Sequence, residues 1–246
     1  MTHAATSYDM TLVVLSYVIS VFGAYTALQL AVAIPGAKGN ALWGWLGGAA
    51  LAMGGGAIWS MHFIAMLAFR MPMQVGYDVA LTLGSLLVAV AVTGVGLFIV
   101  GRGEPGFGRL LAAGTFTGLG VAAMHYTGMA AMVMPARLTY APVPFALSLV
   151  IAIVASMAAL WLAFNLRGNA QRFGSAFVMG AAVCGMHYTG MAAANFTFDY
   201  KHVVRASSVM ESDSLALSIF LVTAALLSIT LIVALKRSQR TLEYQL

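Results

Sequence analysis

Residues 124–132 read Met-His-Tyr-Thr-Gly-Met-Ala-Ala-Met, and the same pattern returns at residues 186–194 as Met-His-Tyr-Thr-Gly-Met-Ala-Ala-Ala. A weaker copy at residues 61–66 reads Met-His-Phe-Ile-Ala-Met. The intervals between the central histidines are 63 and 62 residues, and these histidines are His62, His125 and His187. A motif that returns at a near-constant interval indicates an internal repeat. Each copy places one histidine inside an apolar stretch, so the repeat has a polar centre.

The composition excludes a soluble protein. The chain is 61% hydrophobic and 8% charged, and its mean hydropathy is +0.93, whereas soluble domains carry about 25% charged residues. Apolar runs long enough to cross a bilayer core of about 30 Å lie near 11–34, 42–67, 79–101, 109–134, 143–166, 173–195 and 215–235. We therefore expect an all-α membrane protein: a seven-transmembrane helix bundle built from three two-helix repeats plus a seventh helix.

Charges between the runs predict how the bundle is oriented. Lys and Arg flanking one side number four, namely Arg70, Arg137, Lys201 and Arg205. The other side has eight, namely Lys38, Arg102, Arg109, Arg167, Arg172, Lys236, Arg237 and Arg240. Because cytoplasmic loops are enriched in Lys and Arg, the N-terminus is predicted outside and the C-terminus in the cytoplasm of a bacterial inner membrane. The net charge of +5 then reflects loops beside anionic lipid rather than a nucleic-acid partner.

The histidines belong to a longer stripe on their helices. A methionine follows each histidine by four residues, one turn further out on the same face, at Met66, Met129 and Met191. A glycine precedes each by seven residues, where a missing side chain lets helices pack closely, at Gly55, Gly118 and Gly180. All three histidines fall in the outer half of the second, fourth and sixth spans. They are therefore predicted to converge at one depth.

This combination of side chains predicts a copper site. A polar residue inside a membrane helix is costly and indicates function. Imidazole with thioether suits copper, especially Cu(I), and zinc would leave the methionines unexplained. The predicted ligands are His62, His125, His187, Met66, Met129 and Met191. Additional ligands or neighbours of the metal could come from Met61, Met124, Met186, Tyr126, Tyr188 and Cys184, whereas His3 and His202 are expected outside the site.

The motifs closely resemble those of the MHYT family, bacterial integral-membrane sensor domains named after the Met-His-Tyr-Thr tetrapeptide. The resemblance covers about residues 8–237, and the copies at 124–127 and 186–189 match the tetrapeptide. The first copy departs from it, with Phe63 and Ile64 in place of tyrosine and threonine. The resemblance implies that copper is bound through Met61, His62, Met124, His125, Tyr126, Met186, His187 and Tyr188. It also implies that the domain senses a diatomic gas such as O2, CO or NO.

Members of this family often continue into cytoplasmic domains that make or degrade cyclic di-GMP, or into kinases and regulators. The resemblance therefore implies an output domain or a partner protein in the cytoplasm. Residues 238–246 are expected to be a short cytoplasmic tail or a connector to that output. A homodimer is left open at this point.

The prediction is thus an integral-membrane sensor, not an enzyme, that binds copper and responds to a diatomic gas or to redox state. Two other functions stay open. A haem- or copper-containing redox protein is one, because histidines from different helices can hold haem. Copper storage or transport is the other, although the inner half of the spans offers no further ligands. A retinal protein is excluded because the seventh run, near 215–235, contains no lysine.

Overall fold

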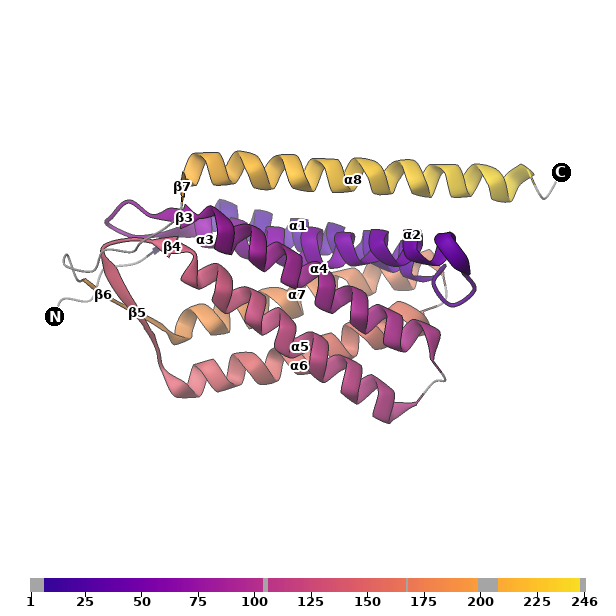
Figure 1. The fold of residues 1–246 in the computed structure, drawn as a ribbon, viewed down its shortest axis with the longest axis horizontal. Helices are drawn as coiled ribbons and strands as arrows, with labels where there is room; N and C mark the ends of the chain where they lie inside the picture. The colour runs from indigo at the N-terminus through magenta and orange to yellow at the C-terminus, as the bar shows by residue number, and fades with distance from the viewer. Residues whose placement is uncertain (1–6, 104–105, 167, 199–207, 244–246) are drawn as a thin grey trace.

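The computed structural model describes residues 7–103, 106–166, 168–198 and 208–243, and long helices run side by side through it (Figure 1). The helices are α1 (Met10–Ala31), α2 (Gly39–Ala50), η1 (Leu51–Trp59), α3 (Ser60–Ala68), α4 (Val79–Arg102), α5 (Phe107–Ala130), α6 (Pro142–Asn165), α7 (Asn169–Ala193) and α8 (Ser212–Glu243). Because α2, η1 and α3 follow without a break, they form one helical segment, Gly39–Ala68.

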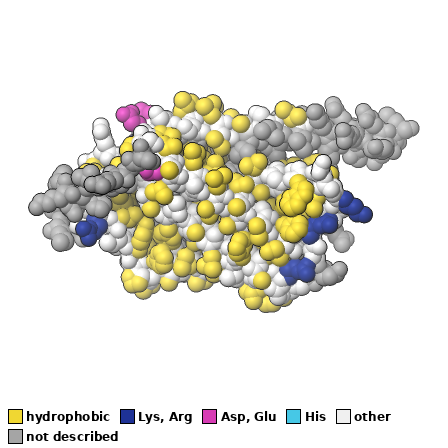
Figure 2. Space-filling view, in the orientation of Figure 1, with side chains coloured by type: hydrophobic (Ala, Val, Ile, Leu, Met, Phe, Trp, Pro, Cys, Tyr) yellow, Lys and Arg dark blue, Asp and Glu magenta, His cyan; other side chains and the backbone are white. Residues whose placement is uncertain are grey.

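The protein is an all-α, multi-pass membrane protein. Within the described residues, six helical segments are long and apolar enough to cross a membrane, and α8 contributes a shorter apolar stretch, Ser212–Ala225. The flank of the bundle is covered by apolar side chains, whereas Lys and Arg lie towards its two ends (Figure 2). Large apolar residues such as Leu87 and Val143 are 71% and 77% exposed. Such a surface is stable against lipid rather than water.

Short strands join the helices at the end of the bundle where the chain starts. Three antiparallel pairs form there: β1 (Ser7–Tyr8) with β2 (Phe69–Arg70), β3 (Gly76–Asp78) with β4 (Met132–Val133), and β5 (Ala136–Tyr140) with β6 (Ala194–Phe198). In each pair one strand precedes a repeat and the other follows its histidine helix. β7 (Val209–Glu211) adds to the edge of β3 and leads into α8.

The strands correct the helix ends expected from the sequence. The fourth apolar run was expected to be helical to residue 134, but α5 ends at Ala130 and β4 follows. Backbone groups leaving the bundle here pair with a neighbouring strand instead of continuing the helix. α8 begins at Ser212 and continues to Glu243, so most of the expected tail is helical. Residues 199–207 and 244–246 lie outside the described part of the chain.

The repeat glycines Gly118 and Gly180 lie at close helix crossings. A Cβ on Gly118 would lie 2.5 Å from Cα of Ile153 on α6, and one on Gly180 would lie 2.8 Å from Cγ2 of Val21 on α1. In the first repeat the close approach falls on Gly54, whose Cβ would lie 2.5 Å from the carbonyl oxygen of Ala89. Gly55, the expected position, is the next residue and stays a prediction. Both glycines lie in the π-helix η1, whose wider turns change the helical period before His62.

Gly118→Ala is expected to destabilise the bundle by about 1–3 kcal/mol, because the added methyl group overlaps the backbone of α6. The matched control is Gly108→Ala on the same helix, where a Cβ would meet nothing within 4 Å. The control should be neutral or slightly stabilising, because alanine is a better helix former than glycine. Thermal unfolding in detergent measures both variants. Equal melting temperatures for the two would contradict the close crossing.

Candidate metal centre

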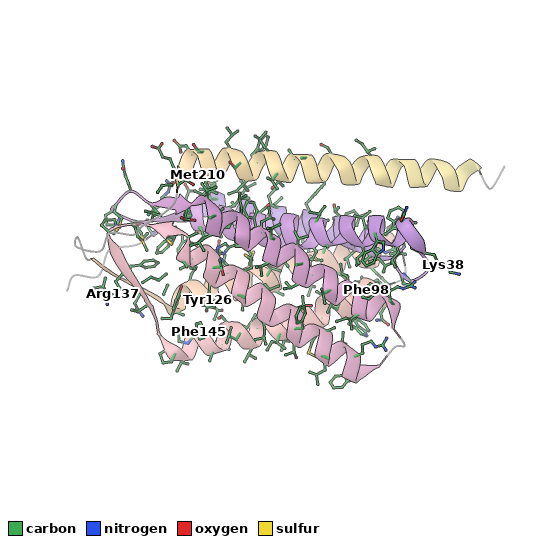
Figure 3. All side chains as sticks on the ribbon, viewed as in Figure 1. Lys38, Phe98, Tyr126, Arg137, Phe145 and Met210 are labelled. Carbon is green, nitrogen blue, oxygen red and sulfur yellow. The ribbon has the colours of Figure 1, made fainter. Side chains whose placement is uncertain are left out.

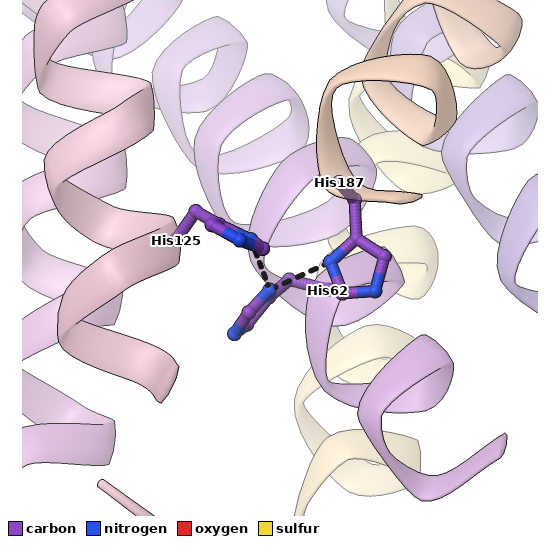
Figure 4. A group of neighbouring side chains, drawn as sticks. All are labelled: His62, His125 and His187. Carbon is purple, nitrogen blue, oxygen red and sulfur yellow. Dashed lines mark hydrogen bonds between the residues drawn. The ribbon is translucent and has the colours of Figure 1, made fainter. Parts of the chain in front are cut away.

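Three imidazoles meet inside the bundle, one from each repeat (Figure 4). Nδ1 of His62 lies 3.0 Å from Nδ1 of His187 and 3.1 Å from Nδ1 of His125. The rings stand nearly perpendicular to one another, with centroids 4.9–5.1 Å apart. All three side chains are at most 1% exposed. Helices far apart in the sequence, α3, α5 and α7, thus present their histidines at one depth.

The protein alone does not satisfy these ring nitrogens. A single Nδ1 offers either one proton or one lone pair, so the Nδ1 of His62 cannot bond well to both of its neighbours. The Nε2 atoms of all three rings are buried and have no hydrogen-bond partner. An unpaired buried polar group costs about 1–3 kcal/mol. A cation between the rings would give the three Nδ1 lone pairs one shared partner.

The separations suit a metal ion. Nitrogen ligands lie about 2.0–2.1 Å from an ion such as zinc, which places neighbouring nitrogens on the order of 3–3.5 Å apart. Among the described residues, these histidines are the group of His, Cys, Asp or Glu side chains that could hold a metal, with candidate ligand atoms within 4.8 Å of one another. The residues present therefore fit a bound ion.

Two motif glycines make room for the neighbouring imidazole. A Cβ on Gly128 would overlap Nε2 of His62, and a Cβ on Gly190 would overlap Nε2 of His125. Each glycine follows the histidine of its own helix by three residues and lies against the histidine of the preceding repeat. The sequence interpretation missed them, although their common offset from the histidine was a signal that could have found them. The first repeat has Ala65 at this offset.

The motif tyrosines point away from the centre. The hydroxyl group of Tyr126 lies 2.7 Å from Oγ of Ser148 on α6, and that of Tyr188 lies 3.4 Å from Oγ of Ser16 on α1. Tyr126 also packs against Phe145, the side chain labelled beside it on α6 (Figure 3). These tyrosines therefore tie each histidine helix to a neighbouring helix. Cys184 likewise lies beside Ser16.

In the first repeat a different residue makes the hydrogen bond between the histidine helix and a serine of a neighbouring helix. Phe63 has no hydroxyl group, and the indole Nε1 of Trp59, one turn earlier, donates to Oγ of Ser85 at 3.0 Å. Ser16, Ser85 and Ser148 each stand seven residues after the N-cap of their helix, at Asp9, Asp78 and Ala141. The departure of the first motif copy from tyrosine is thus compensated within the same helix.

The predicted sulfur ligands are buried beside the histidines. Met66, Met129 and Met191 are at most 4% exposed, one turn outward from the triad. The methionines that precede the histidines, Met61, Met124 and Met186, are at most 2% exposed. Their roles as ligands stay predictions. His3 and His202 lie outside the described residues.

Aromatic side chains close the strand end above the triad. The Tyr8 ring packs against Phe69 of β2 and edge-on against Tyr188. Burial raises the pKa of Tyr8 to about 12, and burial likewise raises the pKa of Tyr140 to about 12. Both phenols are therefore neutral at physiological pH. The strands contribute no ionised tyrosine above the histidines.

Comparisons with known proteins identify the repeat. A family model for the MHYT repeat, described as "Bacterial signalling protein N terminal repeat", matches residues 55–113, 118–176 and 180–243. Each match begins at or within one residue of a close helix crossing. No solved structure matches the chain.

Three curated relatives cover most of the chain. The bifunctional diguanylate cyclase/cyclic di-GMP phosphodiesterase MucR of Pseudomonas aeruginosa is 44% identical over 95% of this chain and 34% of its own length. The cyclic di-GMP phosphodiesterase NbdA of the same organism is 40% identical over 76% of this chain and 24% of its length. The signaling protein YkoW of Bacillus subtilis is 35% identical over 87% of this chain and 27% of its own length. The chain thus spans about a third or less of these relatives.

Gly190→Ala is expected to displace His125 and to remove most metal binding. Gly185→Ala on the same helix is the control, because a Cβ there would meet nothing within 4 Å. Both changes raise helix propensity equally, so propensity cannot explain a difference. The measurement is metal content by mass spectrometry after loading with Cu(I) and removal of the excess. Equal retention by both variants would show that the imidazole packing does not govern binding.

Proposed function

The chain belongs to the MHYT family, and on that basis we propose that it is a sensor that binds copper in the outer half of the membrane. The observation that carries this proposal is the convergence of three buried, unsatisfied imidazoles from three repeats. The proposed ligands are His62, His125 and His187, assisted by the methionines one turn outward. Copper bound there would supply an open position for a diatomic gas and a one-electron couple.

The chemistry of the site supports copper, in particular Cu(I). Imidazole and thioether are ligands that Cu(I) prefers. A single positive charge is also less costly to bury than a double one in a site whose described ligands include no carboxylate. The imidazole rings are in contact with one another, which supports a single ion rather than a haem between them.

Positive charges support the proposed orientation. Lys38 lies at the end of the bundle opposite the strands, whereas Arg137 lies among the strands (Figure 3). Arg102 is also at the Lys38 end, where it donates to the carbonyl oxygens of Pro35 and Ala37. Because the end richer in Lys and Arg is cytoplasmic, the triad belongs to the outer half and α8 is a seventh span that ends in the cytoplasm.

The names of the relatives support an output in cyclic di-GMP signalling. MucR and NbdA are described by activities on this nucleotide, and each is about three to four times as long as the matched region. We propose that α8 connects the sensor to a cytoplasmic domain or partner of this kind. The signal would be a diatomic gas or a redox change at the triad.

Two hydrogen bonds link α8 to η1 beside the triad. Thr223 of α8 donates its hydroxyl proton to Oγ of Ser60 at 2.9 Å, and Ser60 donates to the carbonyl oxygen of Gly55 at 2.9 Å. Ser60 lies two residues before His62 and directly after η1. π-helices often occur at functional sites. We propose that a shift of α3 at His62 is passed through Ser60 to η1 and α8.

His125→Ala and His187→Ala test the copper site. Each variant is expected to lose most of its copper. Removing a residue that only supports a metal ligand typically lowers metal affinity roughly 10–100-fold, and removing the ligand itself should lower it further. Tyr126→Phe is the control, since its hydroxyl group bonds to Ser148 outside the triad. Copper per chain is measured on detergent-purified protein. Full copper in both histidine variants would disprove the site.

Ser60→Ala and Thr223→Val test the route to α8. Each removes a buried hydrogen bond of about 1 kcal/mol and is expected to weaken the coupling while leaving the copper content unchanged. The measurement is hydrogen exchange of residues 212–225 with and without copper. Ser218→Ala is the control, because its hydroxyl group bonds to the carbonyl oxygen of Ser214 and to the sulfur of Met210, neither of which belongs to this route. The same copper-dependent change in all three variants would rule this route out.

A further inference from the structure

A narrow cavity lies inside the bundle, on the side of the triad away from the strands. Its volume is about 50 Å³, and side chains from α1, η1, α4, α5, α6 and α7 line it. The residues four before each histidine, Ile58, Val121 and Val183, are all part of the lining. Four residues are about one turn, or roughly 5.4 Å along a helix. The cavity therefore begins one turn beneath the imidazoles.

The cavity follows the axis around which the repeats are arranged. Leu28, Leu97 and Leu160 line it, and each stands nineteen residues after the N-cap of its helix. On α6 the lining runs from Ala152 to Ala163, which corresponds to about 16 Å at 1.5 Å per residue. A small volume extended over this length makes a slender passage that leads towards the triad.

The passage is suited to an apolar occupant. Its lining is mostly aliphatic and has three hydroxyl side chains, Thr93, Thr117 and Ser156. Thr93 donates to the carbonyl oxygen of Ala89 at 2.7 Å, and Thr117 donates to that of Val92 at 3.4 Å. A buried water needs about two to four polar partners, whereas apolar cavities stay dry and accept apolar guests. The small volume admits only molecules of a few heavy atoms.

The opposite side of the triad faces a more polar hollow, whose lining includes Met66 together with Arg70, Glu211 and Asp213. Met66, Met129 and Met191 are buried there, and Tyr77 of β3 is 2% exposed behind Phe63. The strands then cover the end of the bundle (Figure 1). Among the described residues, the mostly aliphatic space beside the triad therefore lies on the side of the cavity.

We propose that this cavity is a docking chamber from which a small, uncharged, apolar molecule approaches the histidine triad between Ile58, Val121 and Val183. The proposal rests on the proposed function in one respect, since a docked molecule is sensed only if the triad holds a metal. The chamber itself depends on the packing of the bundle, so its occupancy can be measured separately from copper.

Xenon is the probe for the chamber. Full-length protein in lipid nanodiscs, with and without copper, is equilibrated with xenon, and binding is followed by xenon NMR. Wild type is expected to bind xenon, and Ala155→Leu to lose it, because the larger side chain fills the lining. Ala158→Leu on the exposed face of the same helix should bind like wild type. Leu160→Ala should raise xenon occupancy by enlarging the chamber.

Carbon monoxide then tests the approach to the triad. The rate at which CO binds to Cu(I)-loaded protein, followed by its infrared stretch, should fall several-fold in Ala155→Leu and stay unchanged in Ala158→Leu, with equal copper contents. Equal xenon binding by wild type and Ala155→Leu, or no xenon in wild type and Leu160→Ala, would overturn the chamber. An unchanged CO rate in Ala155→Leu would overturn the approach. A chain that binds xenon but no copper would disprove only the metal site.

Discussion

The meeting of three imidazoles in a dry interior is the constraint on which the rest of the structure depends. Nδ1 of His62 lies 3.0–3.1 Å from Nδ1 of each of the other two histidines, and such an approach requires the side chains of three non-adjacent helices to meet in one place. Gly128 and Gly190 make room directly beside the rings, whereas Gly118 and Gly180 let the histidine helices pack closely on α6 and α1. Hydrogen bonds to Ser16, Ser85 and Ser148 hold each histidine helix in register with a neighbouring helix. The triad is thus supported by glycines that allow close helix packing and by hydrogen bonds between the helices.

The repeat is closed by the first helix rather than the last. The family repeats pair each histidine helix with the helix that follows it, and the third match extends to residue 243. Yet the hydroxyl group of Tyr188 on α7 meets Ser16 of α1, while α8 lies outside along η1, α3 and α1 (Figure 1). Because α1 takes the place beside α7, α8 packs on the outside of the bundle, against η1, α3 and α1. This arrangement separates the helix that completes the site from the helix that we propose carries the signal.

Much of the fold followed from hydropathy and from the period of the repeat. Six of the expected spans match apolar helical segments, because length and composition decide which segments can cross a bilayer. The short strands were not expected, since their pairs join residues far apart in the chain, such as Gly76 and Val133, and two or three residues carry too little pattern. The π-helix was missed for a related reason. A uniform helical period was assumed through Gly54 and Gly55, where the structure has π-helical turns.

The sequence by itself determined that His62, His125 and His187 lie in apolar helices at matched positions, because a repeat copies depth along with residue type. It also identified the buried methionines one turn away, since spacing along one helix is local. Only the tertiary structure decided that the tyrosines turn towards Ser16 and Ser148, that Trp59 replaces the missing tyrosine, and that a cavity lies beneath the triad. Those features depend on which helices become neighbours. Helix neighbours are set by packing between distant segments, which the period of a single helix does not contain.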